Sequence, residues 1–121
     1  MLPSILIVED HTEFRQALCH FLEIHDVQAK LLEASSGEEG VLLARKKKPQ
    51  VVIMDFQLGG ISGLEAAAQI KQADPQCHIL MLTLFNSKEI PFVYRKGAVE
   101  AFINKSDLDD YLIPILEQIL S

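Results

Sequence analysis

Several features that would restrict the class of this protein are scarce or missing in its 121 residues. There are two cysteines, Cys19 and Cys77, too few for a disulfide framework and in keeping with a reducing cytosol. Both lie in apolar patterns, so we expect buried free thiols. No apolar run approaches the roughly 20 residues that span a bilayer, and no basic segment leads into a long apolar stretch near the start. The sequence predicts a cytoplasmic protein without a signal peptide or a membrane segment.

Positive charge is also in the minority. There are 11 Lys and Arg against 17 Asp and Glu, which gives a net charge of −6. Nucleic-acid phosphates select basic surfaces, so we expect no direct contact between this segment and nucleic acid. The one basic run, residues 45–48, is interpreted as a solvated helix end, where cations suit the helix dipole.

The remaining composition is that of one globular domain. Hydrophobic residues make up 49% of the chain and charged residues 23%. A chain of this length buries a substantial core without disulfides or metals. No repeat, linker or low-complexity tract interrupts it, so residues 1–121 are interpreted as a single domain.

Short apolar runs alternate with helical patterns along the chain. The runs predict strands over residues 4–8, 27–34, 51–54, 78–83 and 100–104. Helical spacing predicts helices over residues 12–24, from Ser36 to Pro49, over 63–73 and 87–96, and from near Asp107 to the end. Such βα units imply an α/β fold of the flavodoxin-like type. We predict three layers, with a parallel five-stranded sheet of order 2-1-3-4-5 and helices on both faces.

Local signals add detail to these helices. Thr12 is predicted to cap the first helix, and Ser36 with Glu39 has the spacing of a capping box. The helix over 63–73 is predicted to turn four apolar side chains inward, namely Leu64, Ala67, Ala68 and Ile70.

Polar side chains stand where the predicted strands end. Glu9 and Asp10 follow the first strand, Asp55 the third and Lys105 the fifth, and Thr83 ends the fourth. In the predicted strand order these ends meet in one crevice. Carboxylates placed side by side repel one another and lose solvation, so a cation is expected there.

This set of residues suits phosphoryl chemistry. Hard oxygen ligands favour Mg²⁺, and a carboxylate beside a metal and a lysine can act as a nucleophile that forms an acyl phosphate. Thr83 can donate a hydrogen bond to a phosphoryl oxygen. Strand ends are often polar by default, and Asp10 could simply cap the following helix. Asp55 is the hardest to explain in this way, because an acid directly after a buried strand is costly unless it is used.

The whole chain resembles the receiver domain of two-component response regulators. The resemblance rests on the βα units and on residues 5–11 (ILIVEDH), 49–65 (PQVVIMDFQLGGISGLE), 79–83 (ILMLT) and 96–105 (KGAVEAFINK). The first and last of these segments are most similar to the NarL/FixJ (LuxR-type) branch. Members of that branch usually carry a C-terminal helix-turn-helix domain that binds DNA, so the resemblance implies an output domain absent from this segment, or a receiver that acts alone.

The resemblance implies a role for each polar residue of the crevice. Asp55 would accept a phosphoryl group from a sensor histidine kinase or a phosphotransfer protein, which makes the domain a signalling acceptor and not an enzyme. Asp10, Asp55 and the backbone carbonyl of Gln57 would ligate Mg²⁺, and Glu9 would act through a water.

The resemblance also implies a switch. Lys105 would pair with the acids at rest and with the phosphoryl group afterwards, and Thr83 would move toward that group. Phe102 matches the aromatic residue that rotates inward when the threonine moves, although an aromatic residue in an apolar strand can also be core filler. The face formed by residues 87–96, the fifth strand and the last helix would report the change to an output, which we expect to be transcription.

Some residues depart from the family's usual pattern. Gly59 stands where a proline is usual, and Leu84 is bulkier than the small residue that many receivers have after the threonine. Gln57 and Phe85 occupy the positions that tune self-dephosphorylation. Because Phe85 is apolar it should not orient an attacking water, so we predict slow loss of the phosphoryl group.

Two prolines fall in predicted helices on the output face. Pro91 is tolerable in a first helical turn, whereas Pro114 is predicted to kink the last helix. That helix is apolar nearly all round, which is typical of burial on more than one side. We therefore expect it to contribute to a homodimer interface or to dock on a missing output domain.

Two other functions remain open at this point. A pseudo-receiver would use the same fold as a phosphorylation-independent protein–protein interaction module, and Leu84, Gly59 and the prolines slightly favour it. A hydrolase of the haloacid dehalogenase type would need a second aspartate two residues after the nucleophile, but Gln57 occupies that position.

Overall fold

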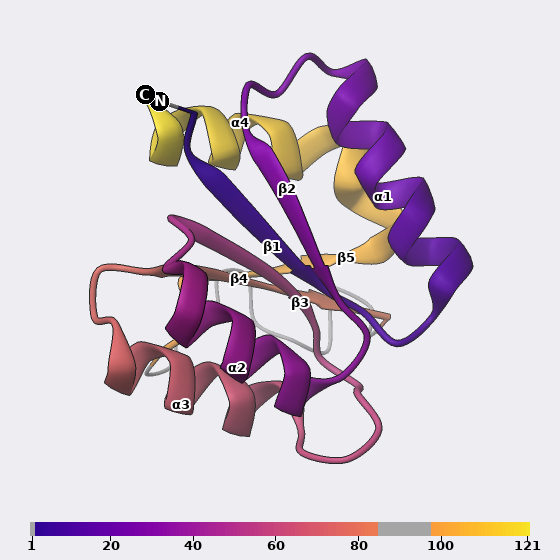
Figure 1. Cartoon of the computed structure of the whole chain (residues 1–121). Helices are drawn as coiled ribbons and strands as arrows, with labels where there is room; N and C mark the ends of the chain where they lie inside the picture. The colour runs from indigo at the N-terminus through magenta and orange to yellow at the C-terminus, as the bar shows by residue number, and fades with distance from the viewer. Residues whose placement is uncertain (1, 85–97) are drawn as a thin grey trace.

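A computed structural model describes residues 2–84 and 98–121 of the chain (Figure 1). Its strands are β1 (Ser4–Val8), β2 (Lys30–Ala34), β3 (Val51–Asp55), β4 (His78–Thr83) and β5 (Ala101–Asn104). Its helices are α1 (Thr12–Ile24), α2 (Gly37–Lys47), α3 (Gly63–Ala73) and α4 (Leu108–Leu120), the last preceded by the short 3₁₀ helix η1 (Lys105–Asp107). The predicted helix over 87–96, Pro91 and Phe85 lie outside the described residues.

The strands form one parallel sheet in the order β2-β1-β3-β4-β5, as predicted. Val8 pairs with Met54, and Asp55 pairs with Leu82, so β1, β3 and β4 end at nearly the same level. Parallel pairing brings all the carboxyl ends to one edge of the sheet. That edge is where the predicted site residues belong.

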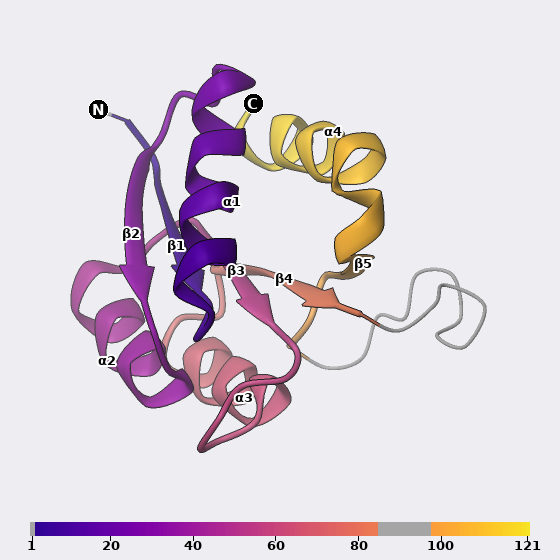
Figure 2. The ribbon, with the colours of Figure 1, turned by 90° about the vertical axis from the view of Figure 1, so that its right-hand side faces the viewer.

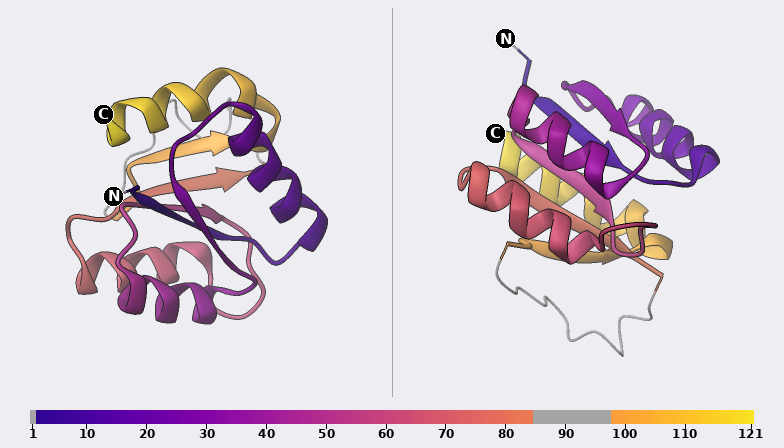
Figure 3. Two further views of the ribbon diagram at one scale, coloured as in Figure 1. Left: turned by 45° about the horizontal axis from the view of Figure 1, so that its top comes forward. Right: turned by 60° about the horizontal axis from the view of Figure 1, so that its bottom comes forward.

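Helices cover both faces of the sheet, and each face has its own core (Figures 1 and 3). Successive residues of a strand point to opposite faces, so Ile5 and Ile7 face α1 and α4, whereas Leu6 and Val8 face α2 and α3. The first core includes Leu18, Leu22, Leu112 and Leu116, and the second includes Val41, Ala44, Ala66, Ala67 and Ile70. Figure 2 shows α1 and α4 on the same side of the twisted sheet. The apolar runs of β1, β3 and β4 are explained by this burial on both faces.

The inward face of α3 differs from the prediction. Leu64 and Ala68 are exposed, and the buried residues are Gly63, Ala66, Ala67 and Ile70. These four have the spacing i, i+3, i+4, i+7 that one helix face requires. The prediction was wrong because it favoured the larger apolar side chain over Gly63, whose backbone lies against Asp55.

The helix caps are mostly as predicted, with one correction. Ser36 caps α2 by accepting a hydrogen bond from the Glu39 N–H at 3.1 Å. Thr12 is not the cap, because it is already the first residue of α1, and the Arg15 N–H donates to the His11 carbonyl at 2.9 Å. His11 is the N-cap residue and makes no capping hydrogen bond with its side chain.

The start of β2 also differs from the prediction, which began that strand at residue 27. The Val27 N–H donates to the Leu22 carbonyl and so belongs to the turn that ends α1. Asp26, just before it, has φ of 60°. The extended strand therefore begins only at Lys30.

The last helix buries one side against the sheet. Pro114 lies on the exposed side of α4, and the helix continues through it. Leu112 and Leu116 are buried against the sheet, whereas Tyr111 is exposed. Burial of a further side of α4, against a second copy of the chain or an output domain, stays a prediction.

The two cysteines and the basic run were also predicted from the sequence. Cys77 is buried, but Cys19 is only half-buried, and both are free thiols. Arg45, Lys46 and Lys47 form the last turn of α2, as expected for the basic run. None of the helices in residues 2–84 and 98–121 is long and apolar enough to cross a membrane.

Candidate functional site

The predicted site residues gather at the carboxyl edge of the sheet. Asp55 is the last residue of β3, and Thr83 is the last residue of β4. Glu9 directly follows β1, and Lys105 directly follows β5. Because β1, β3, β4 and β5 are neighbours in the sheet, residues from four distant segments meet here.

Three carboxylates form an acidic cluster at this edge. Glu9, Asp10 and Asp55 each place a carboxylate oxygen within 4.8 Å of the others. Glu9 is 2% exposed and Asp55 7% exposed, whereas Asp10 faces solvent. Like charges this close, with two of them removed from water, need a positive partner.

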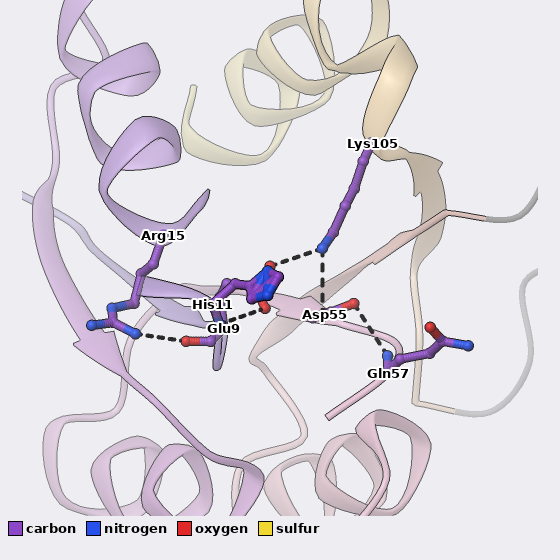
Figure 4. A network of polar contacts seen from close by, with 6 residues as sticks. All are labelled: Glu9, His11, Arg15, Asp55, Gln57 and Lys105. Atoms are coloured by element: carbon purple, nitrogen blue, oxygen red, sulfur yellow. Dashed lines mark hydrogen bonds and ion pairs between the residues drawn. The ribbon is translucent and has the colours of Figure 1, made fainter. Parts of the chain in front are cut away.

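Lys105 supplies part of that positive charge. Its Nζ donates a hydrogen bond to Glu9 Oε1 at 2.8 Å and lies 3.5 Å from Asp55 Oδ2 (Figure 4). Its side chain is itself largely buried. One ammonium therefore lies between two buried carboxylates and balances only one of them.

The pKa of Glu9 reflects this excess of negative charge over positive charge. Burial raises the pKa of Glu9 to about 7, although the hydrogen bond from Lys105 acts in the opposite direction. The nearby Asp55 carboxylate raises the pKa of Glu9 further. The cluster therefore carries more negative than positive charge, and the atoms it offers to a metal ion are all carboxylate oxygens. Such a donor set fits a hard divalent cation of the Mg²⁺ type.

The backbone around the cluster is held by residues that the sequence prediction missed. Arg15, in the first turn of α1, donates from Nη1 to the backbone carbonyl of Glu9 at 2.8 Å and pairs through Nε with Glu33 at 3.0 Å. The His11 N–H donates to Glu9 Oε2 at 3.4 Å. An arginine one turn after the acidic pair was the only available signal, and its partner is a backbone atom that no sequence pattern specifies.

The loop after Asp55 is fixed at its start. The Gln57 N–H donates to Asp55 Oδ1 at 3.1 Å (Figure 4). One Asp55 oxygen is thereby directed to the loop, and the other lies toward Lys105.

The two predicted switch residues lie on adjacent strands. Thr83 is buried and pairs in register with Asn104 of β5, while Phe102 pairs with Met81. Phe102 is half-buried on the α2 and α3 side, with its ring centroid 6.2 Å from that of Phe56 in an edge-to-face arrangement. Leu84, just beyond Thr83, is 72% exposed.

Comparison with known proteins gives the family. Residues 5–116 match the response regulator receiver domain. The chain belongs to this family. Its receiver fold, predicted from the order of strands and helices, is confirmed.

The relatives also place this receiver among regulators of the LuxR/NarL type, as predicted. The transcriptional regulatory protein LiaR of Bacillus subtilis is 35% identical over 104 residues, which cover 84% of this chain and 49% of LiaR. A LuxR-family two-component response regulator from Aurantimonas sp. SI85-9A1 is 27% identical with a TM-score of 0.81, over 99% of this chain and 86% of that one. The chain spans about half the length of the curated relatives it matches.

One similar structure was solved as a complex with a metal ion. It is the response regulator TrrA from Thermotoga maritima in complex with Mg²⁺–BeF. TrrA is 26% identical to this chain with a TM-score of 0.83, and the match covers 98% of this chain and all of TrrA (100%).

Proposed function

We propose that this receiver accepts a phosphoryl group on Asp55 and switches an output in response. One observation carries the proposal: Lys105 Nζ lies between Glu9 and Asp55, at 2.8 Å and 3.5 Å, within a cluster of three carboxylates. That arrangement combines a buried carboxylate nucleophile with a cation placed to balance the incoming oxygens.

The acidic cluster supports a Mg²⁺ site. Asp10, Asp55 and the backbone carbonyl of Gln57 would ligate the ion, and Glu9 would reach it through a water. When bound, Mg²⁺ neutralises charge on the carboxylates and on the phosphoryl oxygens. The Mg²⁺–BeF complex of TrrA supports this assignment by similarity.

The chemical step is a transfer from nitrogen to oxygen. A carboxylate oxygen of Asp55 attacks phosphorus, an O–P bond forms, and the N–P bond to a histidine of the donor breaks. The histidine nitrogen keeps the electron pair and takes a proton from solvent. Lys105 then balances the phosphoryl oxygens, and the Thr83 hydroxyl donates a hydrogen bond to one of them. The domain acts as a signalling acceptor that is phosphorylated and slowly loses the group, without turnover of a metabolite.

The readout follows from charge. A phosphoryl group adds almost two negative charges beside Thr83 and Lys105. Movement of Thr83 toward it would favour an inward position of Phe102 and so alter the face that includes β5 and α4. We propose that a sensor histidine kinase or phosphotransfer protein supplies the group. We further propose that the output is transcription, through a DNA-binding domain of the kind that the LuxR-type relatives have.

The decisive experiment is intact-protein mass spectrometry after incubation with Mg²⁺ and acetyl phosphate. The native chain should gain one phosphoryl group and Asp55→Asn none, while omission of Mg²⁺ should prevent the gain. Asp107→Asn is a matched control, because it removes an aspartate outside the acidic cluster and should leave the gain unchanged.

A native chain without added mass would be titrated with beryllofluoride and Mg²⁺. Failure of this second test would refute the proposal and favour a phosphorylation-independent interaction module. Dimerisation through α4 is tested separately by light scattering before and after phosphorylation. A monomer in both states would contradict it.

A further inference from the structure

The loop that joins β3 to α3 has an unusual freedom for a segment so close to the phosphoacceptor. It begins directly after Asp55 and contains Gln57, whose carbonyl is assigned to the metal, followed by Gly59 and Gly60. Gly60 has φ of +82°, which favours glycine. Two adjacent glycines allow many backbone conformations, so the loop needs an anchor beyond the Gln57 hydrogen bond.

That anchor is Glu38, in the first turn of α2. Its Oε1 accepts a hydrogen bond from the Ile61 N–H at 2.7 Å. The acceptor is a side-chain carboxylate oxygen at a short distance from a backbone N–H, which is good hydrogen-bond geometry. Figure 3 shows the start of α2 near the loop that leaves β3, although the two are far apart in sequence.

The packing around this hydrogen bond is tight. A Cβ added at Gly60 would lie 2.6 Å from Glu38 Oε1, so the carboxylate lies directly against the glycine backbone. A Cβ added at Gly37 would lie 2.7 Å from Ile61 Cγ1. Ile61 itself packs on the core between the sheet and the α2–α3 layer. The Glu38 carboxylate thus lies against Gly60, where the loop backbone has the most conformational freedom. Ile61 fixes the end of the loop that leads into α3.

We propose that Glu38 is a positioning residue for the phosphoacceptor site. Asp55 holds the start of the loop through Gln57, and Glu38 holds its end through Ile61, so the Gln57 carbonyl stays at the acidic cluster despite Gly59 and Gly60. Glu38 touches neither the metal nor the phosphoryl group and acts only through the loop backbone. The inference rests on the proposed function, because it gives a role in Mg²⁺ binding to a residue outside the ligand set.

Three variants separate this role from simpler ones. Glu38→Ala removes the acceptor, and Glu38→Gln keeps an acceptor but removes the charge. Glu39→Ala is the matched control, because Glu39 is in the same helical turn with the same charge, yet its side chain accepts from the Ser35 hydroxyl and not from the loop. Glu38 is exposed, so its replacement leaves the core intact.

Two readouts are taken on each variant by NMR: hydrogen exchange of the Ile61 amide, and the Kd for MgCl₂ from amide shifts. Glu38→Ala should speed Ile61 exchange and raise the Kd about tenfold, the lower end of the range for residues that orient metal ligands. Glu38→Gln should keep most of both properties, and Glu39→Ala should match the native protein.

Each other outcome has a distinct meaning. An unchanged Kd in Glu38→Ala overturns the inference. Equal weakening in Glu38→Ala and Glu38→Gln also overturns it, because the effect would then come from charge and not from the hydrogen bond. Absence of Mg²⁺ binding in the native protein would instead refute the proposed function, and the inference with it.

Discussion

The ammonium nitrogen of Lys105 lies 4.2 Å from the centroid of the Phe14 ring. Phe14 belongs to the first turn of α1, so the lysine that follows the last strand is held from the first helix. The ammonium thus lies close to three groups, the carboxylates of Glu9 and Asp55 and the ring of Phe14. The negative face of the ring adds attraction without adding another proton acceptor to the cluster.

This contact predicts an energetic coupling between Phe14 and Lys105. Replacing Phe14 with leucine keeps an apolar side chain but removes the ring. In a double-mutant cycle of Phe14→Leu with Lys105→Met, urea denaturation should give a coupling energy of about 1 kcal/mol. Phe14→Tyr, which keeps the ring face, should retain the coupling. A coupling energy near zero would mean that the two side chains are neighbours without interacting.

The raised pKa of Glu9 predicts pH-dependent metal binding. Its pKa of about 7 means that Mg²⁺ must displace a proton at low pH. From linkage, affinity for Mg²⁺ should rise about tenfold between pH 6 and pH 8. Isothermal titration across this range measures it. Glu9→Gln should bind more weakly and without this pH dependence; the same slope in that variant would assign the proton to another group.

Without metal, the raised pKa of Glu9 should make the folded state less stable as pH rises. The folded state raises the pKa of Glu9 from 4.5 to about 7, so between these values it retains a proton that the unfolded chain has lost. The contribution of Glu9 to stability is therefore present below pH 4.5 and is lost as pH rises toward 7. Thermal melting in EDTA should show this decline in the native chain relative to Glu9→Gln. Parallel curves for the two proteins would contradict it.

Two glycines in and just after the loop that follows Asp55 predict opposite responses to alanine. A Cβ at Gly63 would lie 2.6 Å from the Asp55 carbonyl oxygen, whereas a Cβ at Gly59 would meet nothing within 4 Å. Gly63→Ala must displace α3 from β3 and should lower the free energy of unfolding by about 2 kcal/mol. Gly59→Ala should raise it by about 0.4–1 kcal/mol, because the unfolded chain loses freedom. Urea denaturation compares them, and similar effects of the two changes would be inconsistent with this packing.

Pro114 predicts that α4 can be strengthened. It lies within the helix, where proline lacks the N–H of a helical hydrogen bond, and its side chain is exposed. Pro114→Ala should raise the free energy of unfolding by about 2 kcal/mol, after allowing for the greater freedom of the unfolded chain. Glu117→Ala, another exposed substitution in α4, should change it little. A loss of stability in Pro114→Ala would show that the proline makes favourable contacts that alanine cannot.

The sequence predicted which polar residues meet at the carboxyl edge of the sheet, because their grouping depends on strand ends. Once the alternation of strands and helices gives a parallel sheet, the residues after each strand must meet at one edge, so Glu9, Asp55 and Lys105 could be grouped without coordinates. Residues that act through packing or through backbone atoms could not be found in this way. Phe14 contacts the side chain of Lys105, and Glu38 accepts from the N–H of Ile61. The positions of both partners follow only from the packed fold.

The errors in the fold have a related cause. Hydrophobicity placed Leu64 inside and passed over Gly63, because a glycine carries no apolar signal even where close approach to a neighbouring strand determines the buried face. Thr12 was predicted as a cap from residue type alone, although it is the first residue of the helix and His11 occupies the cap position. Such single-residue shifts depend on tertiary contacts, whereas the order of elements depends on patterns many residues long.

The hydrogen bond between Lys105 and Glu9 joins residues 96 positions apart. A ribosome makes Glu9 among the first residues and Lys105 near the end, so the acidic pair has no ammonium partner until nearly the whole domain has been synthesised. A chain that ends before Lys105 would bury these carboxylates without a cation beside them, which desolvation makes unfavourable. The acidic cluster and its ammonium partner are thus completed only together with the fold, so the electrostatic environment of Glu9 and Asp55 is a property of the whole domain and not of any one segment.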